Sequence, residues 1–240
     1  MNIKTIMDRV LFALSVPKCV CCGKRLNYGE KALCLKCSAE FNDFKSRNCA
    51  RCARVLHKCD CTTDYLKSHF IRKTIKCFRY LNRNGANAGN ALIYSLKRDN
   101  RIDVLEHCAD ELENSIRNLI MNPESYIFTN VPRRKSAIVK YGIDQSELLA
   151  REVAKRLGAR YIKLLRSNAK KEQKSLDTTA RLMNADFELV REMDLTNKSV
   201  IIVDDIITTG ASMSSSATLI RSLGCKNIIA ASLAIAYKDE

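Results

Sequence analysis

The chain has 240 residues, which allows one domain of ordinary size and a small appended module. Hydrophobic residues make up 46% of the chain, which is enough for a real core and excludes a globally disordered protein. The formal net charge is +15, and no apolar run approaches the roughly 18 residues that cross a bilayer, so we expect no membrane span.

Residues 1–18 predict a short amphipathic helix. Their apolar run at 10–16 follows the acidic Asp8 and lacks a small-residue cleavage site before Cys19, which disfavours a secretory signal peptide. A helix that docks on a partner or lies on a membrane surface stays open as an alternative. We therefore expect a cytoplasmic protein.

Residues 19 to about 65 are rich in cysteine and poor in long apolar segments. Eight of the twelve cysteines of the chain form close pairs here, namely Cys19, Cys22, Cys34, Cys37, Cys49, Cys52, Cys59 and Cys61. Such spacing in a chain otherwise built like a cytosolic enzyme indicates thiolate metal sites rather than disulfides. We predict that residues 1–65 form a leading helix and a double zinc-ribbon-like module that depends on its metal for folding.

The cysteine pairs predict one or two structural zinc ions, since two thiolates of a CxxC pair can converge on one tetrahedral ion. Adjacent pairs could share an ion, or the pairs could interleave as a cross-brace. Cys21 is expected to be a bystander, and His57 or His69 could replace a thiolate. Because eight thiolates add −8 and two zinc ions +4, the net charge would fall from +15 to about +11.

The stretch 72–101 concentrates positive charge, with eight lysine and arginine residues and one acid, Asp99. It is either a solvated face or a surface that binds a polyphosphate or a nucleic-acid backbone. The nearby Phe70, Phe78 and Tyr80 could stack on bases or belong to the core. The nucleic-acid candidates of this stretch are Arg72, Lys73, Lys76, Arg79 and Arg83.

Residues 70–240 alternate short strand-like and amphipathic helical segments, which predicts a second domain with a doubly wound, mostly parallel α/β sheet. Its helices are expected at Gln145–Leu157 and at Ala211–Leu223, the second ended by Gly224. The polar, aperiodic segment 166–181 is expected to be a lid over the active site. The buried parallel strands are expected at Tyr126–Val131, Tyr161–Leu165, Val200–Val203 and Ile228–Ile235.

The stretch Val200 to Met213 predicts a site for a ribose 5-phosphate, because an apolar strand runs into two carboxylates, a hydroxyl-rich turn and a helix. The helix start presents free N–H groups to a phosphate, with Thr208, Thr209, Gly210, Ala211 and Ser212 as its expected contacts. Asp204 and Asp205 suit the ribose hydroxyls, and we expect them to be the catalytic residues, with Mg²⁺ bound alongside. A simple helix cap needs neither a second acid nor a glycine framed by three hydroxyl residues.

With this site, the sequence resembles the type I phosphoribosyltransferases and, more closely, the ComF/GntX family, which includes a late-competence protein of natural transformation. The resemblance covers nearly the whole chain and combines the cysteine pairs with motifs in a fixed order. Those motifs are Ser95-Leu96-Lys97, Val131-Pro132-Arg133, Gly142-Ile143-Asp144-Gln145, Leu148-Leu149-Ala150, the pattern Arg166, Gln173, Leu176, Arg181, Asn184 and Phe187, and the VIIVDDIITTGAS site.

The resemblance implies that Lys97 lies in a loop that contacts pyrophosphate and that Arg133 faces the same ligand from a strand end. It also implies that Gln173 and Arg181 belong to the lid. In the family an Arg-Gly-(Phe/Tyr)-Asn-Gln element stands where this chain has Tyr141 to Gln145. The loss of the arginine and the change of Asn to Asp144 both lower the expected affinity for anions.

Three functions follow as alternatives. The resemblance favours a competence protein that binds phosphoribosyl pyrophosphate and single-stranded DNA during DNA uptake, together with other competence proteins such as a helicase-type partner. Such a protein would act in the cytoplasm, with the inner face of the membrane as a second location. The others are an active phosphoribosyltransferase with an unidentified acceptor, and a sensor of phosphoribosyl pyrophosphate without turnover.

Overall fold

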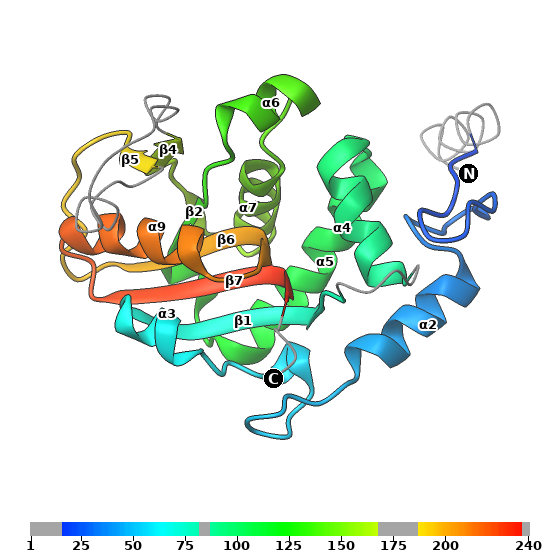
Figure 1. Cartoon of the computed structure of the whole chain (residues 1–240), viewed down its shortest axis with the longest axis horizontal. Helices are drawn as coiled ribbons and strands as arrows, with labels where there is room; N and C mark the ends of the chain where they lie inside the picture. The colour runs from blue at the N-terminus through cyan, green and yellow to red at the C-terminus, as the bar shows by residue number, and fades with distance from the viewer. Residues whose placement is uncertain (1–15, 82–86, 168–186, 237–240) are drawn as a thin grey trace, which may run out of the picture.

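The computed structural model describes residues 16–81, 87–167 and 187–236, and its centre is one parallel sheet (Figure 1). Five strands lie in the order β1-β7-β6-β2-β3, and each neighbouring pair is parallel. This result confirms the predicted mostly parallel α/β sheet. The strands are β1 (Ile71–Arg79), β2 (Ile127–Asn130), β3 (Arg160–Tyr161), β6 (Ser199–Ile207) and β7 (Asn227–Ile235).

Helices cover both faces of the sheet, as a doubly wound fold requires. On one face α4 (Ala88–Arg98), α5 (Ile102–Leu119) and α7 (Gln145–Arg156) share a buried core with Ile201 and Val203 of β6. On the other face α3 (Asp64–Ser68) and α9 (Ala211–Ser222) share a second core with Val200 and Ile202. Alternate residues of β6 thus face opposite cores, which is why this strand is apolar without interruption from 200 to 203.

The predicted helices α7 and α9 are confirmed, and Leu157 and Leu223 are their C-terminal caps. Gly224 directly after α9 has φ +87°, the left-handed conformation expected of a helix-ending glycine. Residue 145 begins α7 because the Asp144 carboxylate accepts the N–H of Glu147 at 3.1 Å. The other helices among the described residues are α2 (Leu35–Lys45), α6 (Lys135–Tyr141) and the 3₁₀ turns η1 (Leu56–Lys58) and η2 (Pro123–Ser125).

One strand prediction was wrong, and one strand was missed. The run Tyr161–Leu165 is not one parallel strand, because Tyr161 ends β3 and Leu165 begins β4 (Leu165–Ser167), which pairs antiparallel with β5 (Phe187–Leu189) in a separate sheet. The strand β1 was missed, because its lysine and arginine residues suggested a surface stretch rather than a sheet strand.

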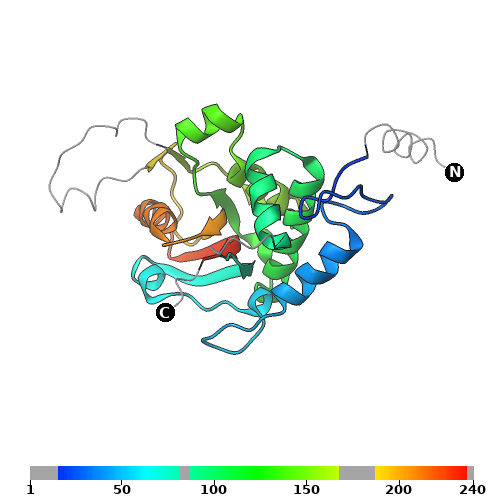
Figure 2. The same cartoon turned by 45° about the vertical axis from the view of Figure 1, so that its right-hand side comes forward.

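The cysteine-rich segment packs against the helical face that carries α4 and α5, on the side where Figure 2 shows α2. Cys19, Leu33 and Phe41 belong to the same buried core as Val104 and Leu112 of α5. Because one core joins the cysteine-rich segment to the rest of the chain, the domain boundary at 65–70 stays a prediction. The leading helix also stays a prediction, since most of it lies outside the described residues. No helix in the described part of the chain is long and apolar enough to cross a membrane.

We expect Ile202→Ala to lower the free energy of unfolding by about 2–5 kcal/mol, because Ile202 is fully buried in a central strand and its loss leaves a cavity. Val139→Ala is the control, since Val139 is 85% exposed and should change stability by less than about 0.5 kcal/mol. Urea unfolding followed by circular dichroism measures both. Equal effects of the two substitutions would contradict the assigned core.

Candidate functional site

The predicted sugar-phosphate turn connects β6 to α9 at the carboxyl edge of the sheet. The strand ends at Ile207, and Gly210 is the N-cap of a helix of 12 residues that begins at Ala211. A cavity of about 50 Å³ is lined by Asp204 and by residues 206–213. The first amides of a helix have no intrahelical partner, so this cavity offers hydrogen-bond donors and a positive dipole end to an anion.

Gly210 is required at this turn for two reasons. Its φ is +84°, in the left-handed region that side chains rarely adopt. A Cβ at this position would also lie 2.9 Å from Cδ2 of Leu66 in α3. The close approach thus comes from α3, behind the turn.

The paired acids lie inside β6, two residues before the strand ends, and not after it as the sequence suggested. Asp204 Oδ1 accepts the hydroxyl of Ser146 at 3.1 Å and the backbone N–H of Asp205 at 2.8 Å. Burial and the neighbouring charge of Asp205 raise the pKa of Asp204 well above its usual range. Asp205 Oδ1 lies 3.1 Å from Nζ of Lys97, so one acid is held by a hydroxyl and the other by a cation.

Lys97 belongs to the last turn of α4, so its predicted place in a loop was wrong. Arg133 follows β2 by three residues, and its Nη1 is buried without a hydrogen-bond partner in the described structure. Both side chains line a second cavity of about 280 Å³ that shares Ile206 and Thr208 with the first. An unpaired buried guanidinium nitrogen next to the turn indicates a place for an anion.

The second cavity also contains residues that the sequence analysis did not assign to the site. Its lining carries three cations and no carboxylate. The Arg98 guanidinium lies 4.2 Å from the ring centroid of Tyr94 and 6.0 Å from that of Tyr141, and Arg133 lies 4.9 Å from the Tyr141 ring. The complete lining is Tyr80, Ile93, Tyr94, Lys97, Arg98, Arg133, Tyr141, Ile206 and Thr208. The cavity therefore combines positive charge with aromatic rings.

Asp144, one of the two departures from the family pattern, is turned into the protein. Its carboxylate accepts the N–H of Arg133 at 3.0 Å in addition to that of Glu147, and Asn130 Nδ2 lies 3.4 Å away. Burial raises the pKa of this carboxyl above its usual value. Asp144 thus fixes the backbone beside the second cavity and does not face an anion there.

Comparisons with known proteins agree with this geometry. Residues 143–240 match the family model described as the phosphoribosyl transferase domain. That match spans the paired acids and the turn, at the edge of a parallel sheet covered on both faces. The chain has a type I phosphoribosyltransferase fold.

Solved structures with similarity to this phosphoribosyltransferase fold share 18–19% sequence identity with the chain. The first is the allosteric regulatory enzyme of purine biosynthesis, with 18% identity, a TM-score of 0.43, and 58% of this chain and 30% of that one covered. Glutamine phosphoribosylpyrophosphate amidotransferase from B. subtilis has 19% identity and a TM-score of 0.43, and the match covers 57% of this chain and 30% of that one. A purine phosphoribosyltransferase from Pyrococcus horikoshii Ot3 has 19% identity and a TM-score of 0.36, and the match covers 55% of this chain and 73% of that one.

The chain thus spans 30% of the length of two of these enzymes. No curated protein matches it.

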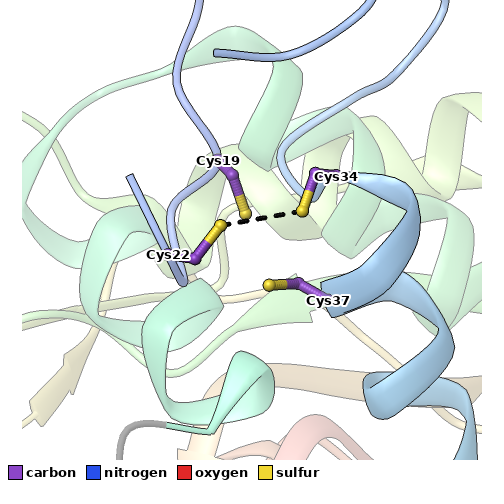
Figure 3. A group of neighbouring side chains, drawn as sticks. All are labelled: Cys19, Cys22, Cys34 and Cys37. Atoms are coloured by element: carbon purple, nitrogen blue, oxygen red, sulfur yellow. Dashed lines mark hydrogen bonds between the residues drawn. The ribbon is translucent and has the colours of Figure 1, made fainter. Parts of the chain in front are cut away.

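Outside the phosphoribosyltransferase-type sheet, the eight paired cysteines form two separate groups. Cys19, Cys22, Cys34 and Cys37 form the first (Figure 3), and Cys49, Cys52, Cys59 and Cys61 form the second. Within each group all sulfur atoms lie within 4.8 Å of one another. Cys21, His57 and His69 belong to neither group. Adjacent pairs therefore converge, and the interleaved alternative does not describe this structure.

The sulfur spacing fits zinc. A tetrahedral ion with bonds of about 2.3 Å holds its sulfur atoms roughly 3.8 Å apart. Sγ of Cys22 lies 3.7 Å from Sγ of Cys34, and Sγ of Cys52 lies 3.5 Å from Sγ of Cys59. The backbone N–H of Arg54 lowers the pKa of the Cys52 thiol to about 6, whereas burial raises the pKa of Cys59 and of Cys61 in the same group, so the case for zinc rests on the sulfur distances. Each group could hold one ion.

The basic stretch does not form one binding face. Lys76 is fully buried, and its ammonium donates to the carbonyls of Cys59, Cys61 and Thr74, so its predicted contact with nucleic acid was wrong. Lys73 pairs with Asp60 at 3.5 Å. Of the other candidates, Arg72 is exposed, Arg79 is half-buried, and Arg83 lies outside the described residues. Gln173 and Arg181 of the predicted lid lie outside them as well.

Removing the charge of Asp204 should stabilise the ligand-free protein. The pKa of Asp204 is raised in the folded state, so above about pH 4 the folded protein keeps a proton on this carboxyl that the unfolded chain has lost. The free energy of unfolding therefore falls as the pH rises above about 4. We expect Asp204→Asn to unfold at higher urea than wild type at pH 7.5, by at least about 1 kcal/mol, and to lose this advantage below pH ~4.

Urea titrations at pH 4 and pH 7.5 measure this difference, with Glu124→Gln on the exposed surface as the control. An Asp204→Asn variant that is less stable than wild type at both pH values would refute the assigned burial of charge.

Proposed function

We propose that the protein binds phosphoribosyl pyrophosphate with Mg²⁺ at the carboxyl edge of the sheet. The observation that carries the proposal is that Asp204 and a helix N-terminus line one cavity, and that a cationic cavity beside it shares Ile206 and Thr208. Ligands of open α/β sheets bind at this edge, beyond the carboxyl ends of the strands. The match to the phosphoribosyl transferase domain supports binding of this ligand in general.

Each part of the ligand has a counterpart in the chain. The 5-phosphate would lie against the turn from Thr208 to Ser212, where hydroxyl and amide groups can donate. The ribose hydroxyls would donate to Asp204 and Asp205. The pyrophosphate would occupy the second cavity beside Lys97 and Arg133. There one of its oxygens would accept a hydrogen bond from Nη1 of Arg133, which has no partner in the described structure. Bound Mg²⁺ would neutralise part of the diphosphate charge.

A transfer reaction is the enzymatic form of this proposal. The bond between C1 of the ribose and the pyrophosphate oxygen would break with its electron pair on the leaving group, and an acceptor would form the new bond to C1. The cations of the second cavity would stabilise the leaving group. Binding without transfer to any acceptor is the alternative, in which the protein is a sensor of the same ligand.

Calorimetric titration with phosphoribosyl pyrophosphate and Mg²⁺ tests the proposal. We expect saturable heat with the wild type and at least about a tenfold weaker affinity for Asp204→Ala/Asp205→Ala, since two hydrogen-bond acceptors for the sugar are lost. Glu192→Ala, at an exposed position remote from the turn, is the control and should bind like the wild type. The absence of heat with the wild type would rule out the proposed ligand.

A role in DNA uptake, as in the ComF/GntX family, is a second candidate, and a groove on another face supports it. This groove has a volume of about 530 Å³ and carries four cations and no acid among its lining residues Lys67, Phe70, Ile71, Arg72, Arg221 and Lys226. Phe70 is 46% exposed, and the Arg221 guanidinium lies 5.3 Å from its ring centroid. Single strands bind to such combinations of phosphate contacts and a stacking ring. The partners would be single-stranded DNA and a helicase-type competence protein at the inner face of the membrane.

We expect Arg221→Ala/Lys226→Ala to weaken binding of a fluorescein-labelled oligo(dT) and to reduce the slope of log affinity against log salt by about 1.4, or about 0.7 for each lost phosphate contact. Fluorescence anisotropy over a series of salt concentrations measures it. Lys36→Ala/Lys155→Ala removes the same charge from exposed positions elsewhere. An equal loss of affinity in both double variants would show that the oligonucleotide does not bind specifically at the groove.

A further inference from the structure

The helix α3 connects the second cysteine group to the sugar-phosphate turn. It occupies residues Asp64–Ser68, with two residues between Cys61 and its start and two between its end and β1. Its Leu66 is 1% exposed and shares a buried core with Ile207 and Met213, on either side of the turn. Cδ2 of Leu66 and Cδ1 of Tyr65 lie 2.9 Å and 3.4 Å from the point where a Cβ of Gly210 would stand. The turn therefore rests on α3.

Short contacts bind the chain between the cysteines and α3 to its surroundings. Nη1 of Arg51 donates to the carbonyl of Thr62 at 2.8 Å, and the hydroxyl of Thr74 in β1 donates to that of Thr62 at 3.2 Å. Thr63 caps α3 by accepting the N–H of Leu66. A helix of only five residues depends on such outside contacts, so the residues around the second cysteine group hold α3 in place together with the core that Leu66 shares with the sheet.

Lys76 supplies a buried charge beside that group. Its ammonium lies 2.8 Å from the carbonyl of Cys61 and 3.4 Å from that of Cys59. Four thiolates around one zinc ion leave a net charge of about −2, which a buried cation nearby can offset. The same contacts tie the two cysteines to β1. A negatively charged cysteine group would therefore stabilise the buried ammonium of Lys76 in addition to the three carbonyls that accept from it.

We propose that the second cysteine group, loaded with zinc, positions the sugar-phosphate turn through α3. In this proposal Lys76 and Leu66 are positioning residues, and loss of the metal loosens the turn. Its consequence for ligand affinity rests on the function proposed above, but the effect on the turn itself does not.

The first cysteine group provides a matched comparison, because it contacts other elements. Next to it, the N–H of Ala32 donates to Asp103 at 3.2 Å and Arg101 donates to the carbonyl of Lys18 at 2.8 Å. These contacts join it to the start of α5. Between the described residues of the first group and those of the turn, no hydrogen bond or ion pair links the two.

Hydrogen exchange of the ligand-free protein tests the proposal. We expect Cys59→Ser/Cys61→Ser to bind one zinc ion fewer and to speed amide exchange at 206–213 by at least about tenfold, because the support of the turn is lost. Cys22→Ser/Cys34→Ser should also lose one zinc ion but leave exchange at 206–213 within about twofold of wild type. Zinc content is measured by mass spectrometry. Equal exchange at the turn in both variants would overturn the proposal.

Milder variants decide the question if the double cysteine variant does not fold. We expect Leu66→Ala to speed amide exchange at 206–213, and Leu66→Met to keep the exchange rate close to that of the wild type. Lys76→Met should speed the transfer of zinc from the second cysteine group to a chelator. Unchanged exchange in Leu66→Ala would contradict the support role. Affinity for phosphoribosyl pyrophosphate is then measured separately: if the wild type does not bind it but exchange responds as described, the proposed function fails while the coupling holds.

Discussion

Two neighbouring carboxylates inside a buried strand impose the main constraint on this structure. Isolated buried charges are costly, so each acid needs a partner or a ligand. Asp205 has the ammonium of Lys97 at 3.1 Å, whereas Asp204 has only a hydroxyl and a backbone N–H, and its pKa is raised. Asp204 is therefore the acid of the pair whose charge is the less compensated in the described structure.

The parallel sheet explains why the rest of the site gathers at the same place. The strands β1, β2 and β6 all end at one edge, so the residues that follow them, Tyr80, Arg133 and Thr208, line one cavity. The turn after β6 is supported from behind by α3 and opens in front into the two cavities. In the proposed coupling, the cysteine-rich segment and the larger α/β sheet serve one site.

The turn and its paired acids could be predicted from the sequence, because the motif is local: strand, acids, turn and helix follow one another within 14 residues from Val200 to Met213. The cavity beside it could not, since Tyr94, Arg98 and Tyr141 come from α4 and α6 and meet only in the folded chain. Charge counting also failed for Lys76, because a lysine that donates to three carbonyls is buried in a strand, and sequence alone does not show those carbonyls. The cysteine pairs were evident, but their pairing needed the distances between sulfur atoms.

The proposed function requires that a sugar phosphate bind at the turn after β6. The most direct measurement is a ¹H–¹⁵N NMR titration of the zinc-loaded protein with ribose 5-phosphate, which shows where the ligand lies without requiring turnover. We expect the largest changes in chemical shift at the amides of Thr208 to Ser212, which line the cavity of about 50 Å³. Saturable changes confined to another surface, with the amides of the turn unmoved, would contradict it.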